Sequence, residues 1–121
     1  MATILLVDDN HEYRELTREV LEMEGYTVLT AANGARAFDL MQQQKPDLVL
    51  TDATMPIMTG IELLHAIRAD EQLKLIPIVL VTGRSSEDFL RSLRQSGADA
   101  ILLKPVLMDK MLMLVRQLLQ A

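Results

Sequence analysis

Acidic side chains stand at two points of the chain where a short apolar run ends. Asp8 and Asp9 follow the run at residues 4–7, and Asp52 ends the strand expected around residues 48–50. Carboxylates that are held close together repel one another, and a hard divalent cation relieves that repulsion. An all-oxygen site suits Mg²⁺, and an aspartate can itself act as a nucleophile that forms an acyl phosphate. These residues therefore indicate magnesium-dependent phosphoryl chemistry.

A hydroxyl group and an ammonium group stand at the ends of two further apolar runs. Thr82 ends the run at 76–81, and Lys104 ends the run at 101–103. Phosphoryl transfer depends mainly on positioning and on neutralising the charge of the phosphoryl oxygens, for which a cation and a hydroxyl donor are suited. Taken singly, each residue has an ordinary explanation as a helix cap, a loop residue, a strand end or a surface lysine. Their combination is more specific.

The elements that position these residues alternate regularly. Apolar runs at 4–7, 26–31, 48–50, 76–81 and 101–103 are separated by amphipathic segments near 11–24, 34–44, 60–70, 86–96 and 106–119. Five strands alternating with five helices predict a doubly wound parallel sheet with helices on both faces. Ligands of such sheets bind at the carboxyl ends of the strands, so we expect the polar residues at four strand ends to converge on one edge.

Finer patterns predict how individual elements are placed. Four runs are continuously apolar, as strands covered on both faces should be, whereas 26–31 alternates and is expected at a sheet edge. The first helix should bury a stripe of Tyr13, Leu16, Val20 and Met23 and end at Gly25.

Helix starts and turns are predicted from their polar residues. The fourth helix should be capped by Ser85 or Ser86, and Ser85 with Asp88 fits the spacing of a capping box. Asn33-Gly34 and Ser96-Gly97 should form turns.

The last helix carries a wide apolar face. Its members are Leu107, Met108, Met111, Leu112, Leu114, Val115, Leu118 and Leu119, which cover an arc of about 160° at ~100° per residue. Met113 falls outside this arc. Two interpretations remain open: a wide core face with one surface methionine, or a helix edge that belongs to a partner surface.

Length and composition exclude several classes of protein. The 121 residues, half of them apolar, predict a single domain over 1–121. Cysteine is absent, which rules out disulfides and thiolate metal sites. The net charge of −5 argues against direct nucleic-acid binding. No apolar run reaches the ~18 residues of a membrane span, and the acidic N-terminal segment does not resemble a signal peptide, so we expect no membrane insertion and a cytoplasmic location.

Motifs at the predicted strand ends resemble those of one family. They are V-D-D at 7–9, D-A-T-M-P at 52–56, glycine at 60, V-T-G at 81–83 and G-A-D-A-I-L-L-K-P at 97–105. In this order, and over the whole chain, they resemble the response regulator receiver domains, the CheY-like phosphoacceptor family. The resemblance implies a flavodoxin/CheY-like α/β fold with strand order 2-1-3-4-5. It also implies a two-component signalling switch whose phosphorylation changes its binding to another protein.

The resemblance assigns roles to the acidic residues. Asp52 is the expected phosphoacceptor. Asp8 and Asp9 are expected to hold Mg²⁺ together with Asp52 and the backbone carbonyl of Thr54. The expected phosphodonor is a histidine kinase or a phosphotransfer protein. A receiver assists its own phosphorylation and dephosphorylation, so no turnover of a separate substrate is expected.

The remaining family roles fall on the last two strand ends. Thr82 is expected to hydrogen-bond one phosphoryl oxygen and Lys104 to pair with another. The family has a cis peptide bond before the proline that follows this lysine, which corresponds to Pro105. Neither His11 nor His65 occupies a family motif position, and both are expected on the helix surface.

One departure from the family affects the signal output. Receivers usually carry an aromatic residue three positions before the lysine, and here that residue is Ile101. We therefore expect output through loop and backbone movement or through a changed dimer surface. A homodimer through the fourth and fifth helices is one arrangement that would use such a surface.

Other departures lie beside the phosphoryl site. Gly83 stands where alanine is common and Val106 where phenylalanine is common. Thr54 and Arg84 lie where family members line the path of the attacking water, so we predict that they set the lifetime of the phosphorylated state.

Three alternative functions compete with a phosphorylated receiver. A dehalogenase-type phosphatase would carry D-x-D on its first strand, and a nucleotide-binding flavodoxin-like protein would carry a phosphate loop rather than D-D-N-H-E. A degenerate receiver that binds proteins without phosphorylation is the remaining alternative, because Ile101 replaces the usual aromatic residue.

Overall fold

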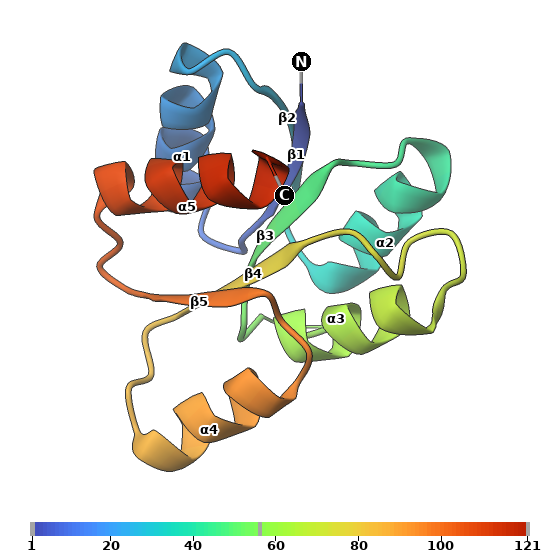
Figure 1. The fold of residues 1–121 in the computed structure, drawn as a ribbon, viewed down its shortest axis with the longest axis vertical. Coiled ribbons are helices and arrows are strands. Elements are labelled where there is room, and N and C mark those ends of the chain that lie inside the picture. The colour runs from blue at the N-terminus through green and yellow to red at the C-terminus, as the bar shows by residue number, and fades with distance from the viewer. Residues whose placement is uncertain (1, 56, 121) are drawn as a thin grey trace.

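Five parallel strands form one sheet at the centre of the molecule (Figure 1). The computed structural model describes residues 2–55 and 57–120. The strands are β1 (Thr3–Val7), β2 (Thr27–Ala31), β3 (Leu48–Asp52), β4 (Ile78–Thr82) and β5 (Ala100–Leu103). Their order is β2-β1-β3-β4-β5. The predicted α/β fold and its 2-1-3-4-5 order are confirmed.

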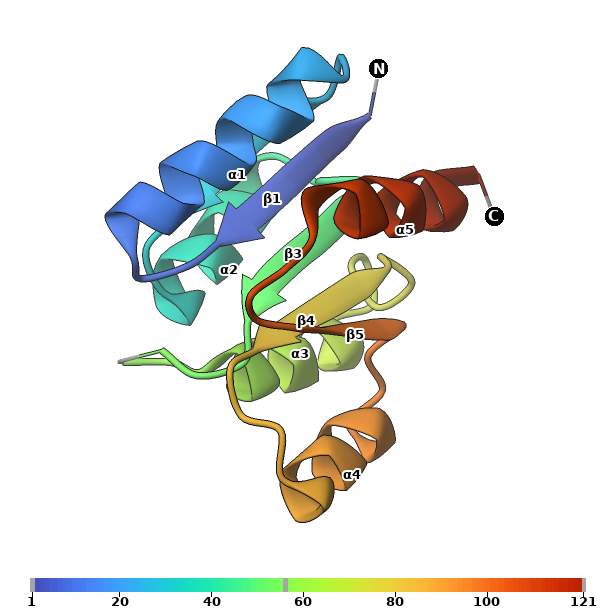
Figure 2. The same cartoon turned by 90° about the vertical axis from the view of Figure 1, so that its left-hand side faces the viewer.

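Helices cover both faces of the sheet, as Figure 2 shows. The five helices are α1 (His11–Met23), α2 (Gly34–Gln43), α3 (Gly60–Ala69), α4 (Glu87–Gln95) and α5 (Met108–Gln120). One apolar core lies between the sheet and α2, α3 and α4, and a second lies between the sheet and α1 and α5. Burial of these two faces holds the strands in place, and with them the strand ends that carry the polar residues. None of the described helices is long and apolar enough to cross a membrane.

The two edge strands are those that the order 2-1-3-4-5 predicts, but one of them is less buried than expected. β2 is an edge strand, as its alternating pattern predicted. β5 is the opposite edge, and its residues are partly buried or exposed, so the expectation that this apolar run is covered on both faces was wrong. Leu103, at the end of the strand, is 45% exposed. A continuous apolar run therefore did not guarantee that both faces of the strand are buried.

The buried stripe of α1 differs from the predicted one. Thr17 and Leu21 are buried, whereas Leu16 is 52% and Met23 85% exposed. The prediction counted only apolar residues, but Thr17 satisfies its hydroxyl by donating to the Tyr13 carbonyl at 2.9 Å. A threonine bonded in this way can be buried at little cost, and this moves the buried face by one residue.

Helix boundaries follow the predicted signals with two corrections. Ser86 caps α4 by accepting from the Phe89 N–H, so the alternative cap at Ser85, with its capping box to Asp88, was wrong. Asn33 caps α2 instead of forming a free turn. Gly25 follows α1 with a φ of 95°, a conformation in which a side chain would be strained.

The core-facing side of α5 is narrower than its apolar arc. Met111 and Val115 are buried, whereas Leu107 and Met113 are each 58% exposed. Met113 is therefore a surface residue, as its position outside the arc predicted.

Candidate functional site

Four strand ends bring polar side chains to one edge of the sheet. Asp52 is the last residue of β3 and Thr82 the last of β4, and Asp8 and Lys104 follow β1 and β5 directly. Parallel pairing places these ends side by side: the Ala53 N–H donates to the Val81 carbonyl, and the Lys104 N–H donates to the Thr82 carbonyl. The hydrogen bonds of the sheet thus assemble residues that are far apart in the chain.

Three carboxylates meet at this edge. Asp8, Asp9 and Asp52 each place one oxygen within 4.8 Å of the others. Asp8 is 3% and Asp52 8% exposed, whereas Asp9 lies open to solvent. Burial raises the pKa of Asp8, helped by the negative charges of Asp52 and Asp9 and opposed by its hydrogen bond from Asn10 and by Lys104. The cluster is therefore short of positive charge.

Lys104 is the cation that faces this cluster. Its Nζ lies 3.0 Å from Asp52 Oδ2 and 3.6 Å from Asp8 Oδ2. Burial by itself would lower the lysine pKa, but the hydrogen bond and charge of Asp52, with the charge of Asp8, outweigh it and raise the pKa. The lysine is therefore firmly protonated, and its ammonium contacts two of the three carboxylates, those of Asp52 and Asp8.

The donor atoms of the cluster fit Mg²⁺. They are all oxygens, and one ammonium leaves the three carboxylates undercompensated. Mg²⁺ is usually held by one or two carboxylates while it keeps several waters, and the exposure of Asp9 leaves space for these. The cluster is therefore a suitable site for a hydrated magnesium ion.

The Asp52 carboxylate is held by a separate donor at each oxygen. The Thr54 N–H donates to Oδ1 at 3.2 Å, and Lys104 donates to Oδ2 at 3.0 Å. The start of α3 lies directly against this turn, where the Gly60 N–H donates to the Ala53 carbonyl. A Cβ at Gly60 would lie 2.0 Å from the Asp52 carbonyl oxygen, so only glycine fits there. Gly60 thus shapes the loop that follows Asp52. Pro56, the last residue of the D-A-T-M-P motif, lies outside the described residues.

Thr82 is beside the cluster, but its hydroxyl is bonded within its own loop. The side chain is 1% exposed, and its Oγ1 accepts from the Arg84 N–H at 3.0 Å. The Arg84 guanidinium stacks on the Phe89 ring of α4 at 4.0 Å from the ring centre. The structure therefore directs the Arg84 side chain to α4 rather than to the carboxylates.

Other residues singled out in the sequence lie around the site. Ile101 is half-buried and lines a groove of about 370 Å³ between α4 and β5, away from the carboxylates. The Lys104-Pro105 peptide bond is cis, as predicted. His11 and His65 are both exposed on helices, also as predicted.

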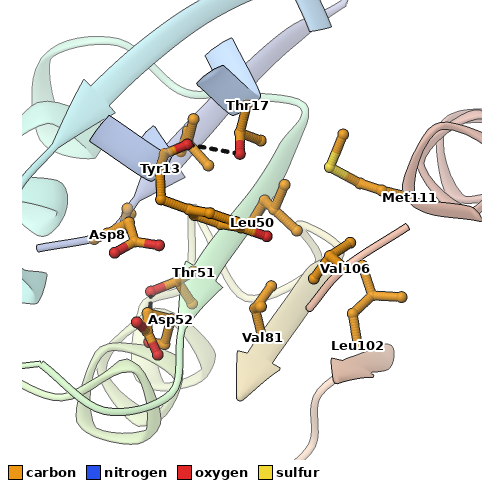
Figure 3. Close-up of a pocket in the computed structure, with 12 residues that line it drawn as sticks. Asp8, Tyr13, Thr17, Leu50, Thr51, Asp52, Val81, Leu102, Val106 and Met111 are labelled. Atoms are coloured by element: carbon orange, nitrogen blue, oxygen red, sulfur yellow. Dashed lines mark hydrogen bonds between the residues drawn. The ribbon is translucent and has the colours of Figure 1, made fainter. Parts of the chain in front are cut away.

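Tyr13 is the site neighbour that the sequence pattern did not reveal. The pattern places it only in the apolar stripe of α1, yet its ring centre lies 4.9 Å from Lys104 Nζ. Figure 3 shows the ring crossing the floor of the site from α1 toward the side on which Val81 and Val106 lie. The sequence feature that could have indicated this contact is the position of Tyr13 in the first turn of α1, the helix that starts at this edge of the sheet.

Comparisons with known proteins agree with this geometry. A family model described as the response regulator receiver domain matches residues 4–116. The polar-differentiation response regulator DivK of Brucella anthropi is 32% identical over 104 residues, which are 86% of this chain and 85% of DivK.

Solved structures with similar folds include two with comparable identity. The chemotaxis response regulator CheY4 of Vibrio cholerae superposes with a TM-score of 0.90 at 33% identity, covering 98% of each chain. The receiver domain of a signal transduction histidine kinase from Syntrophus aciditrophicus gives a TM-score of 0.92 at 32% identity, covering 99% of this chain and 91% of that one.

Proposed function

Since this chain belongs to the response regulator receiver domain family, we propose that Asp52 accepts a phosphoryl group from a histidine kinase or a phosphotransfer protein. The observation that carries the proposal is the environment of the Asp52 carboxylate. It accepts hydrogen bonds from Lys104 and from the Thr54 N–H, and it lies beside the carboxylates of Asp8 and Asp9. We assign Mg²⁺ to Asp8, Asp9, Asp52 and the Thr54 carbonyl. When bound, the ion supplies charge neutralisation for the phosphoryl oxygens.

The reaction is a transfer between two nucleophiles. An Asp52 carboxylate oxygen attacks phosphorus, a P–O bond forms, and the P–N bond to the donor imidazole breaks with its electron pair returning to the ring nitrogen. Lys104 then exchanges Asp52 Oδ2 for a phosphoryl oxygen, over a short distance because its Nζ already lies at 3.0 Å. The product is an acyl phosphate, which water later hydrolyses.

The output signal starts at Thr82, which after Lys104 is the second side chain proposed to contact the phosphoryl group. For Thr82 to donate to a phosphoryl oxygen, its hydroxyl gives up its present donation to the Arg84 carbonyl, which lies at 3.5 Å. Movement of this loop shifts Arg84, which is stacked on Phe89 of α4. With Ile101 in place of an aromatic residue, we propose that loop movement toward α4 carries the signal, and that a homodimer through α4 and α5 is one way to read it.

Residues 1–121 form one receiver domain that acts in the cytoplasm as a switch for protein binding, with no turnover of a separate substrate. Thr54, whose N–H holds Asp52 Oδ1, and Arg84 set the lifetime of the phosphorylated form. Arg84 acts through the loop that it shares with Thr82, since its side chain stacks on Phe89 rather than facing the carboxylates. A degenerate receiver is disfavoured because the acidic cluster and its lysine are complete.

Intact mass after incubation with acetyl phosphate and Mg²⁺ tests the proposal. The wild type should gain one phosphoryl group of about 80 Da as the acyl phosphate. Asp52→Asn, which keeps the side-chain shape without the nucleophile, should gain nothing, and a chelator should abolish the gain in the wild type.

Two negative results of this experiment would lead to different conclusions. No gain with intact magnesium binding would point to a strict donor requirement or a short lifetime, which binding of beryllofluoride would then distinguish. No gain and no magnesium binding would refute the phosphoacceptor proposal and leave a phosphorylation-independent interaction module.

A further inference from the structure

Tyr13 is fixed at the start of α1 by bonds to its backbone. Its N–H donates to Asn10 Oδ1 at 2.9 Å, and its carbonyl accepts from the Thr17 hydroxyl at 2.9 Å. Asn10 and Asp8 are joined in turn, because the Asn10 N–H donates to Asp8 Oδ1 at 2.9 Å. The helix cap therefore holds the backbone of Tyr13, from which the ring extends, beside the strand end that carries the acidic cluster.

Lys104 depends on side-chain contacts to stay at the site. It follows an edge strand, its side chain is 28% exposed, and its flexible stem leaves many conformations open to it. Among the described residues, its ammonium forms ion pairs with Asp52 Oδ2 at 3.0 Å and Asp8 Oδ2 at 3.6 Å, and a third contact with the Tyr13 ring, whose centre lies at 4.9 Å. The two carboxylates are the groups that the proposed function assigns to the phosphoryl group and the metal. The ring is the one of these three neighbours that the chemistry does not engage.

We propose that Tyr13 is a positioning residue whose ring face keeps the Lys104 ammonium at the phosphoacceptor, an inference that rests on the proposed function. A cation over an aromatic face is attracted by the ring quadrupole, and this attraction strengthens when water is partly excluded. The attraction between ring and ammonium does not require a free carboxylate oxygen. It therefore persists when Asp52 and Asp8 are occupied by the phosphoryl group and the metal. The phenol hydroxyl has no part in it.

The floor of the site has room for the ring to be replaced. Beneath the carboxylates lies a cavity of about 10 Å³, lined by Tyr13 together with Asp8 and Asp52 on one side and Val106 and Met111 on the other (Figure 3). This volume is about the least that one water molecule needs, so the ring is closely packed but leaves a small gap beside it. A smaller apolar side chain at position 13 therefore removes the ring from the lysine without overpacking the site.

The first experiment measures the rate constant for phosphorylation by acetyl phosphate with saturating Mg²⁺. Tyr13→Leu should slow it by about twofold to thirtyfold, the range expected when a cation–π attraction is removed from a partly exposed site. Tyr13→Phe keeps the ring face and should stay close to wild type. Tyr26→Leu is the matched control, since Tyr26 is the other tyrosine and packs on the core of α1 and α5.

The rate comparison refutes the proposal in three ways. Tyr13→Leu at the wild-type rate would show that the ring does not position the lysine. Equal slowing in Tyr13→Leu and Tyr26→Leu would mean that only stability had changed. Slowing of Tyr13→Phe to the level of Tyr13→Leu would assign the effect to the hydroxyl.

A second experiment detects the approach of ring and ammonium without any phosphodonor. The chain has no tryptophan and two tyrosines, so Tyr26→Phe leaves Tyr13 as its single tyrosine fluorophore. In that background Lys104→Met should change the tyrosine emission, and Lys110→Met, on the exposed side of α5, should not. No change with Lys104→Met would overturn the proposal. A change in a protein that neither gains phosphate nor binds beryllofluoride would uphold the pairing of Tyr13 with Lys104 and refute the phosphoacceptor function instead.

Discussion

Gly60 is the position where a single methyl group should damage both the fold and the site. A Cβ there would lie 2.0 Å from the Asp52 carbonyl oxygen and 2.9 Å from Ala53 Cα. Ordinary contact begins at 3.4 Å, so the first approach falls short by 1.4 Å, the difference of the two distances. Both obstacles are backbone atoms, which cannot turn aside as a side chain can. Either α3 or the end of β3 must therefore move.

The size of the effect follows from this displacement. Overpacking by added methyl groups usually costs about 1–3 kcal/mol, and a backbone obstacle of this kind belongs at or above the upper end. Alanine's better helix propensity returns less than about 1 kcal/mol of that cost. For Gly60→Ala we expect the free energy of unfolding to fall by about 2–3 kcal/mol. With a slope of about 2 kcal/mol per molar urea, the midpoint should fall by about 1–1.5 M.

Gly83→Ala is the matched control for urea unfolding. A Cβ there meets nothing within 4 Å, and Gly83 has no positive φ, so this variant should keep or slightly raise the stability. Because Asp52 itself moves, Gly60→Ala should also slow phosphorylation by acetyl phosphate by up to about a hundredfold, as misplacement by an ångström can. A Gly60→Ala protein as stable as the Gly83→Ala protein would refute the close approach of α3 to the phosphoacceptor turn.

Three further predictions concern charged residues, two of them at the carboxylate cluster and one in the Thr82 loop. Lys104→Met should tighten Mg²⁺ binding by about threefold or more in calorimetric titration, because a competing cation is removed, while slowing phosphorylation; weaker binding would contradict the charge balance. The raised pKa of Asp8 means that the folded state holds its proton more tightly than the unfolded chain. Stability without metal should therefore fall as pH rises from the usual carboxyl value of 3.8 through the higher folded pKa. Asp8→Asn should remove that fall and stabilise the protein at neutral pH, as measured by urea unfolding in chelator. Arg84→Ala should change the dephosphorylation rate constant measured by phosphate release, and an unchanged rate would remove Arg84 from control of the lifetime.

Much of the fold could be predicted from the residues because its signals are local. Alternating apolar runs and amphipathic segments reflect hydrogen bonding and burial within each element. The convergence of Asp8, Asp52 and Lys104 followed from a general property of parallel sheets, whose strand ends share an edge. The strand order, by contrast, came from the family resemblance and not from any pattern in the strands.

What only the tertiary structure decided depends on contacts between distant segments. The apolar run of β5 does not show that its residues are only partly buried, because their burial depends on how the helices pack against this edge strand. The buried face of α1 moved by one residue because Thr17 is bonded to Tyr13 and needs no water. The meeting of Tyr13 with Lys104, 91 positions apart in the chain, arises only when α1 and β5 dock at the same edge of the sheet. Periodicity records which side of an element is apolar, whereas packing of the whole chain determines which side chain lies against it.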